Sequence, residues 1–238
     1  ILYSHPEWII SAYLDQLGNL DEVRELLIAN NTAPRPTLVS WPGLSTQNDL
    51  VDVGATVTPF SPYGAIFDGS PASLDLIVQR KAGVQDEGSQ LAALVLSRHH
   101  EITPGEKWLD MCAGPGGKAA LLAAEATLGG AELTANEVIP GRADLVRKAL
   151  TILPDVDVVT GDGVHIGLDQ PNTYDRILLD APCTGLGALR RRPEARWRKS
   201  PKDVGDLTAL QAQLLTSALH ALKPGGVLAY VTCSPHLA

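Results

Sequence analysis

The sequence contains few cysteine, methionine and aromatic residues, and the cysteine shortage excludes two classes of structure. Its 238 residues include three cysteines, one methionine and two phenylalanines. Three cysteines without a closely spaced pair supply neither a disulfide framework nor the paired ligands of a zinc site. Because an odd number of cysteines suits thiols in a reducing compartment, we expect a cytoplasmic protein that uses no metal.

Long hydrophobic runs are also missing from the sequence. Its apolar stretches are far shorter than the ~20 residues that cross a bilayer, and no basic segment followed by an apolar one opens the chain. We therefore expect no membrane association. The single methionine is Met111, so Ile1 is not a translation start, and we expect a segment to precede it.

Basic residues are outnumbered by acidic ones, with 19 Lys and Arg against 27 Asp and Glu. The net charge of −8 disfavours a nucleic-acid partner. Between residues 190 and 202, however, seven basic residues accompany one acid, Glu194, and we call this segment the basic stretch. Its basic residues are Arg190, Arg191, Arg192, Arg196, Arg198, Lys199 and Lys202. It predicts contacts with phosphates, and a solvated surface segment is the alternative.

The sequence pattern changes near residue 85, which predicts two domains. Residues 1–84 combine expected helices with short expected strands, which predicts a small α+β domain. The expected helices there cover 7–14, 21–30 and 45–51, and the expected strands cover 36–41, 56–57 and 74–78. Prolines at positions 59, 62 and 71 make the second half of this domain rich in loops.

From residue 85 to 238 short apolar strands alternate with amphipathic helices. We expect strands at 107–111, 131–136, 156–160, 176–180 and 227–232, separated by helices at 118–128, 141–150 and 204–222. This alternation predicts an α/β fold with a doubly wound, Rossmann-like parallel sheet. Ligands of such sheets bind beyond the carboxyl ends of the strands.

A glycine-rich turn follows the first strand of this second domain. Lys118 is followed by Ala119 rather than Ser or Thr, which excludes a phosphate-binding P-loop. The third glycine of a nicotinamide fingerprint is missing as well. We therefore predict that the turn binds S-adenosylmethionine. The residues of the turn are Cys112, Ala113, Gly114, Pro115, Gly116, Gly117 and Lys118.

Acidic residues follow the next three strands. Glu137 follows the second strand and is placed to bind ribose hydroxyls, while Asp162 follows the third and can meet the adenine amino group. Asp180 ends the fourth strand, near the positive charge of the donor or the substrate base. Each alone is more often a turn or helix-cap residue, but their common register favours a ligand site.

Two cysteines follow the fourth and fifth strands, and their positions predict covalent catalysis. Cys183 and Cys233 can face one base if these strands are neighbours at ~4.8 Å. A thiolate that adds to C6 of a pyrimidine makes C5 able to accept a methyl group, and this step requires no metal. We expect Cys112, in contrast, to act as a small buried apolar residue.

Four segments together resemble the bacterial Sun/Fmu (RsmB-type) ribosomal RNA cytosine-C5 methyltransferase family. They are residues 109–118 (LDMCAGPGGK), 180–187 (DAPCTGLG), 190–197 (RRRPEARW) and 232–235 (TCSP). The resemblance implies that Cys233 attacks C6 and that Cys183 assists proton removal and product release. It also implies that the glycine-rich turn, with Glu137, Asp162, Asp180 and a donor-site arginine at Arg142, holds S-adenosylmethionine.

The resemblance further implies a division of labour between domains. Residues 85–238 would form the Rossmann-like methyltransferase domain, and residues 1–84 a small RNA-recognition-like domain. The expected substrate is 16S ribosomal RNA, contacted by Arg190, Arg191, Arg192, Arg196 and Arg198, and we expect a monomer. Because the family's sheet continues with two more strands, we expect this sheet to be truncated after its fifth strand. Transfer RNA is an alternative substrate, and a non-catalytic RNA-binding or ribosome-assembly factor is an alternative function.

Overall fold

The computed structural model describes residues 3–153 and 156–236, which fold into two compact units. The sheet unit comprises residues 35–180 and 214–231, and the helical unit comprises residues 1–34, 181–213 and 232–238. None of the segments of these two units begins or ends at the predicted boundary between residues 84 and 85. The assignment of two domains, 1–84 and 85–238, stays a prediction. In the part of the chain that the structure describes, no helix is both long and apolar enough to cross a membrane.

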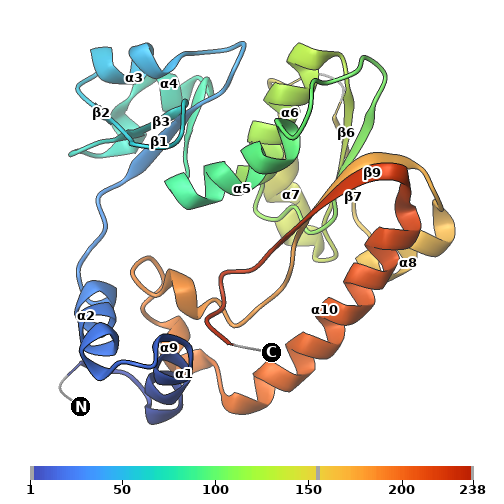
Figure 1. Ribbon diagram of the computed structural model, residues 1–238. Coiled ribbons are helices and arrows are strands. Elements are labelled where there is room, and N and C mark those ends of the chain that lie inside the picture. Colours follow the sequence, from blue (N-terminus) through green and yellow to red (C-terminus); the bar gives the residue numbers. More distant parts are fainter. Residues whose placement is uncertain (1–2, 154–155, 237–238) are drawn as a thin grey trace. The chain divides into compact units, whose positions relative to one another are not determined.

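The sheet unit contains a sheet of five parallel strands in the order β7-β6-β5-β8-β9. Figure 1 labels β6, β7 and β9 of this sheet. The strands are β5 (Lys107–Asp110), β6 (Glu132–Asn136), β7 (Val156–Val159), β8 (Tyr174–Asp180) and β9 (Leu222–Val231). The intervening helices are α6 (Gly117–Gly129), α7 (Pro140–Ala149), α8 (Gly163–Asp169) and α10 (Pro201–Ala221). This topology confirms the predicted parallel α/β sheet. The strand order reverses between β5 and β8, which is where sheets of this kind bind their ligands.

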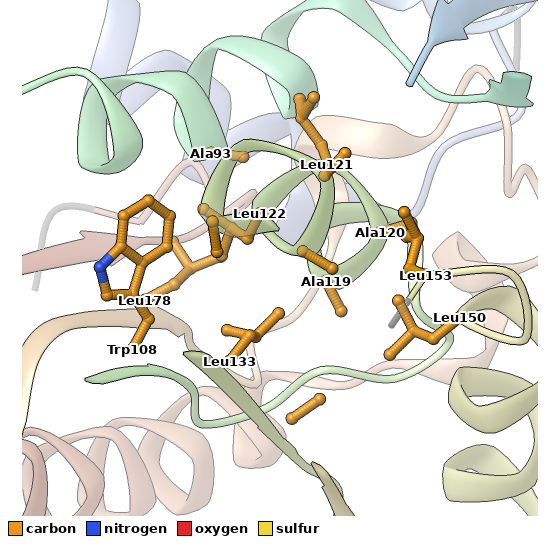
Figure 2. Packing of buried hydrophobic residues seen from close by; sticks show 14 of the residues in the cluster. Ala93, Trp108, Ala119, Ala120, Leu121, Leu122, Leu133, Leu150, Leu153 and Leu178 are labelled. Atoms are coloured by element: carbon orange, nitrogen blue, oxygen red, sulfur yellow. The ribbon is translucent and has the colours of Figure 1, made fainter. Parts of the chain in front are cut away.

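The main core forms where one face of this sheet packs against α6 and against α5 (Glu87–Ser97). Figure 2 shows Trp108, Leu133 and Leu178, from three neighbouring strands, around Leu122 of α6. Helix α6 is rich in alanine, and its small side chains let the helix backbone approach the strands closely. This close packing fixes the start of α6 above the carboxyl ends of the strands.

A buried arginine joins β8 to the beginning of β5. The Arg176 side chain is fully buried, and its Nε donates a hydrogen bond to Glu106 Oε2 at 2.7 Å. Its guanidinium lies 4.8 Å from the centre of the Trp108 ring. It also donates to the backbone oxygens of Leu96 and Ser97 at the end of α5. Burial alone would raise the pKa of Glu106, but its hydrogen bonds, led by those from Arg176, hold that pKa below its ordinary value.

A second, antiparallel sheet precedes the main one, in the order β2-β3-β1-β4. Its strands are β1 (Thr37–Ser40), β2 (Thr56–Val57), β3 (Gly64–Ile66) and β4 (Ala82–Val84), with α3 (Gln47–Asp52) and α4 (Asp75–Val78) between them and the short helix η1 (Pro71–Ser73) before α4. Tyr63 donates to Glu125 of α6 at 2.6 Å, and Arg98 also bonds Glu125 and lies over the Tyr63 ring. This polar cluster attaches the small sheet to the main core.

The helical unit assembles three segments that are distant in sequence. Helices α1 (Glu7–Leu17) and α2 (Leu20–Asn30) pack around Leu186 and Leu189, whose side chains are fully buried. The Tyr13 hydroxyl donates to the Leu186 carbonyl at 2.7 Å. The unit also contains η2 (Leu186–Ala188), α9 (Ala195–Arg198) and the first part of α10. The segment after β8 is thus supported by the amino-terminal helices.

The structure corrects one strand prediction and adds elements that the sequence pattern did not reveal. Residues 74–78 are not a strand, because Asp75–Val78 forms helix α4. The short strands β3 and β4 and the helix α8 were not predicted. All three are brief, and their alternation of apolar and polar residues is too short to define a period.

The Arg176–Glu106 pair gives the first testable prediction. Replacing Arg176 by Gln leaves the Glu106 carboxylate buried without its ionic partner, which typically lowers the free energy of unfolding by about 3–5 kcal/mol. Arg35→Gln is the matched control, because Arg35 pairs with Asp68 at the surface, where both side chains are more than half exposed. Urea unfolding followed by circular dichroism measures both variants, and equal stability of the two would contradict this role of Arg176.

Candidate active site

The predicted donor-binding turn lies between β5 and α6. Gly116 has φ +108°, a left-handed conformation that side chains disfavour, and α6 begins at the next residue. The Ala113 amide donates to the Asn136 carbonyl at 2.8 Å, which ties the turn to the end of β6. The backbone can therefore approach a ligand closely and present amide groups at the start of a helix.

Glu137 and Arg142 lie beside this turn. The Glu137 carboxylate accepts hydrogen bonds from the Gly114 amide at 3.1 Å and from the Ile139 amide at 2.9 Å. Arg142 donates to the Gly114 carbonyl, and its Nη2 lies 3.6 Å from Glu137 Oε2. The two residues that the sequence placed in the donor site thus contact the glycine-rich turn directly.

Asp162 lies three residues after the end of β7 and immediately before α8. Its carboxylate accepts a hydrogen bond from the Val164 amide at 3.0 Å, so it caps the helix. This is the helix-cap role that competes with adenine binding in the sequence prediction. The Val164 amide bonds only Oδ1 of the Asp162 carboxylate. Binding of the adenine amino group by Asp162 stays a prediction.

Asp180 ends β8 and forms an ion pair with the last residue of the turn. Lys118 Nζ lies 2.8 Å from Asp180 Oδ2, and the two side chains are 16% and 33% exposed. The pair joins the start of α6 to the strand end across the point where the strand order reverses. A lysine and a carboxylate are therefore held together at the predicted ligand edge.

Asp110 is a further acidic residue of this edge, which sequence reasoning missed. It ends β5, it is fully buried, and among the described residues neither of its carboxylate oxygens has a hydrogen-bond partner. Burial, together with the negative charge of Asp180, raises the pKa of Asp110 to about 7. Asp110 could have been recognised in the sequence by its position, because it ends a strand of the parallel sheet, as Asp180 does.

The carboxylates of Asp110, Glu137, Asp162 and Asp180 thus occur at the ends of four neighbouring parallel strands. S-adenosylmethionine has hydroxyl and amino groups that donate hydrogen bonds, together with a sulfonium and an ammonium charge. Carboxylates match these groups, and two buried acceptors on Asp110 lack a donor among the described residues. The residues present therefore fit this cofactor.

The two predicted catalytic cysteines lie together in the helical unit. Cys183 Sγ and Cys233 Sγ are 3.4 Å apart, and no disulfide joins them. Two further contacts hold the same segments, because Thr184 Oγ1 lies 2.9 Å from Ser234 Oγ and the Gly187 amide donates to the Cys233 carbonyl at 2.8 Å. Cys233 is the more exposed of the two. Both sulfurs can therefore reach one small reactant.

Cys112 differs from these two cysteines. Burial, together with the negative charges of Asp110 and Glu137, raises the pKa of the Cys112 thiol to about 12. A thiol with such a pKa is protonated near neutral pH and is a poor nucleophile. Cys112 is only partly buried, and its role as a small buried apolar residue stays a prediction.

The basic stretch is mostly exposed, with one exception. Arg190, Arg191, Arg192 and Arg198 are exposed. Arg196 is only 3% exposed, and it donates to the Ser4 and Asn30 carbonyls and to Asn31 Oδ1. Because its guanidinium holds α9 against the amino-terminal segment, the structure corrects its assignment as an RNA contact.

Comparison with known proteins identifies the family. Residues 97–238 match the family model described as 16S rRNA methyltransferase RsmB/F. The chain belongs to this family. The predicted family is therefore confirmed, and the predicted cofactor is confirmed as well, because RsmB/F proteins are S-adenosylmethionine-dependent methyltransferases.

Two curated relatives show how much of an RsmB/F protein this chain represents. A Mycobacterium tuberculosis protein named as a methyltransferase, Rv1407, is 46% identical over 240 residues, covering 100% of this chain and 52% of the relative. Ribosomal RNA small subunit methyltransferase B of Pasteurella multocida is 30% identical, covering 97% of this chain and 53% of that protein. The chain thus spans about half the length of these relatives.

Solved structures show the same fold. A methyltransferase homologue from Pyrococcus horikoshii superposes with a TM-score of 0.77 at 27% identity, covering 98% of this chain and 75% of that one. NSun6 from Pyrococcus horikoshii superposes with a TM-score of 0.82 at 18% identity, covering 100% of this chain and 85% of that one. The second likeness supports the fold alone.

Two adjacent glycines give a test of the turn. A Cβ on Gly116 would lie 2.8 Å from Ala149 Cβ and 3.2 Å from Val146 Cα, and its φ of +108° strains any side chain. Gly116→Ala should lower the free energy of unfolding by about 1–3 kcal/mol. Gly117→Ala is the control, because a Cβ there meets no described atom within 4 Å. Denaturant unfolding without cofactor compares them, and equal losses would contradict the assigned conformation.

The buried carboxyl of Asp110 predicts a pH-dependent stability. Its pKa is about 7 in the folded protein against an ordinary 3.8, so the folded state holds a proton that the unfolded chain releases. The free energy of unfolding therefore falls as pH rises from about 4 to about 7 and this loss levels off above pH 7. Asp110→Asn cannot ionise, so the variant should gain stability relative to the native protein over this range. Urea unfolding at several pH values measures the difference, and a gap that is constant with pH would refute the assignment.

Proposed function

We propose that this chain is the catalytic part of an RNA cytosine-C5 methyltransferase that acts on 16S ribosomal RNA through a covalent enzyme–RNA intermediate. One observation carries the proposal, which is the 3.4 Å separation of Cys183 Sγ and Cys233 Sγ. Methyl transfer to an oxygen, to an amine or to a ring nitrogen has no use for two adjacent thiols, because those atoms are already nucleophilic.

The first thiol provides the nucleophile. C5 of cytosine is a weak nucleophile because it belongs to an aromatic ring. When the Cys233 thiolate adds to C6, a carbon–sulfur bond forms, the C5=C6 double bond breaks, and C5 gains enamine character. The greater exposure of Cys233 supports its assignment to this step. Bound S-adenosylmethionine supplies the methyl group that C5 then takes.

The second thiol assists release. After methylation C5 carries both a proton and the new methyl group, and the product remains attached to Cys233. Cys183, deprotonated, accepts the C5 proton, the electron pair restores the C5=C6 double bond, and the Cys233 thiolate leaves. The contact between the two sulfurs supports this exchange, because the base and the leaving group serve the same C5–C6 bond.

The donor residues are proposed as follows. The glycine-rich turn and Arg142 would hold the cofactor's amino-acid end, Glu137 the ribose, Asp162 the adenine, and Asp180 the positive charge or the substrate base. Only two residues separate Cys183 from Asp180, and only Thr232 separates Cys233 from the end of β9. The two thiols therefore follow closely in the chain on strands β8 and β9 of the sheet that carries the proposed donor residues.

The proposed RNA partner follows from the family and from the basic stretch. Relatives of this chain are named as ribosomal RNA small subunit methyltransferases. The exposed arginines at positions 190, 191, 192 and 198 provide the positive charge that phosphates require, on a chain whose net charge is −8.

Cysteine variants test the covalent mechanism. Cys183→Ala should trap a protein–RNA adduct that survives denaturing gel electrophoresis, because the proton on C5 cannot leave and the carbon–sulfur bond persists. Cys233→Ala should form none, since the nucleophile is missing. The reaction uses the full protein, S-adenosylmethionine and 16S ribosomal RNA.

The native protein is the control and should release its methylated product, so it should leave no stable adduct in this assay. An adduct formed by the Cys183→Ala, Cys233→Ala double variant would refute the mechanism. Methyl transfer is measured in a separate assay, in which tritium from the labelled methyl group of the cofactor is counted in the RNA. Label in transfer RNA alone would assign the other substrate, and binding of RNA without any transfer would indicate a non-catalytic factor.

A further inference from the structure

The basic stretch exposes its tryptophan and buries the arginine beside it. Trp197 is 65% exposed, whereas the neighbouring Arg196 is 3% exposed. Burial of a tryptophan side chain normally stabilises a fold by several kcal/mol, and burial of an arginine requires partners for its charge and its donors. An exposed large apolar side chain beside a buried charge is therefore an informative departure from the usual distribution.

The buried arginine fixes the orientation of the helix that carries the tryptophan. Both residues belong to α9, and Arg196 Nη1 donates to Asn31 Oδ1 at 2.8 Å and to the Ser4 carbonyl at 3.1 Å. Ala195, on the same helix, packs against the cluster that contains Leu189. Successive positions of a helix point about 100° apart, so anchoring Arg196 inward turns Trp197 outward. The exposed ring is thus held in place by contacts of its neighbours.

The surroundings of Trp197 in the chain favour a nucleic-acid base over an apolar protein surface. Arg198 follows it directly and is exposed, and the exposed Arg190, Arg191 and Arg192 precede it in the same stretch. Proteins that bind single-stranded RNA combine positive charge along the backbone with aromatic rings on which bases stack. Other strongly exposed apolar residues, such as Leu168 on α8, have no such cluster of arginines in sequence.

We infer that Trp197 is a stacking platform for an unpaired base of the RNA substrate, with the flanking arginines bound to the phosphates on either side. The inference rests on the proposed function for the identity of the RNA, and it adds a specificity-determining contact to it. Such a contact selects single-stranded or splayed-out nucleotides, because a base within a duplex has no free face. Trp197 thereby restricts methylation to cytosines beside an unpaired neighbour.

The test measures RNA affinity in the full protein. The probes are a single-stranded pyrimidine-rich oligoribonucleotide and a duplex of the same sequence, and binding is measured over a series of salt concentrations. Trp197→Ala should weaken binding of the single strand by roughly five- to hundredfold, the usual effect of removing one stacked base, and should leave duplex binding unchanged. Trp197→Phe should recover most of the affinity, because phenylalanine keeps an aromatic face.

Salt dependence separates stacking from charge. Trp197→Ala should leave the slope of log affinity against log salt unchanged, whereas Arg198→Ala should reduce that slope by about 0.7 for each lost phosphate contact on a single strand. Leu168→Ala, which removes another strongly exposed apolar side chain, is the matched control and should bind both probes like the native protein.

Tryptophan fluorescence gives an independent readout on the folded Trp197→Phe variant. The chain has four tryptophans, so quenching by RNA that disappears in this variant is assigned to Trp197. Unchanged single-strand affinity in Trp197→Ala together with unchanged quenching in Trp197→Phe overturns the inference. The inference is also overturned if Trp197→Ala weakens binding to a protein partner but leaves RNA binding unchanged. Quenching by RNA in a protein that transfers no methyl group would refute the proposed function and leave the stacking role standing.

Discussion

The buried contact between Arg176 and Glu106 sets the geometry on which the donor site depends. Arg176 lies near the start of β8 and Glu106 immediately precedes β5, so their ion pair fixes how these two neighbouring strands align. Asp180 and Asp110 end the same two strands. Because a shift of one residue in a strand turns each side chain to the opposite face, this alignment decides whether both carboxylates reach the ligand edge.

The edge of the parallel sheet at the carboxyl ends of its strands is strongly acidic, and few basic side chains pair with its carboxylates. Four carboxylates follow successive strands, while Lys118 and Arg142 each pair with one of them. A cationic cofactor would offset the remaining negative charge, and the pKa of Asp110 is raised mainly by burial and secondarily by the negative charge of Asp180. Burial, together with these negative charges, raises the pKa of the nearby Cys112 thiol, which distinguishes it from the two cysteines of the proposed mechanism.

Sequence reasoning succeeded where local pattern determines structure. The five strands of the parallel sheet follow from short apolar segments, and the turn between β5 and α6 follows from its glycines. It missed Asp110, because the predicted strand continued to Met111 and so placed Asp110 inside the strand, whereas β5 ends at Asp110. It misjudged Arg196, because its burial depends on Ser4 and Asn31, more than 160 residues away. Contacts of that separation leave no local signal.

The backbone beneath the two cysteines has a consequence for turnover. The Gly187 amide bonds the Cys233 carbonyl, and a Cβ at Gly187 would lie only 2.9 Å from that oxygen, so the two segments meet through main-chain atoms. Thr184 and Ser234 add a hydroxyl contact beside it. Neither link involves sulfur. In the proposed mechanism, Cys233 can therefore form and break its bond to the base, and Cys183 can gain and lose a proton, while the main-chain contacts that space the pair stay in place.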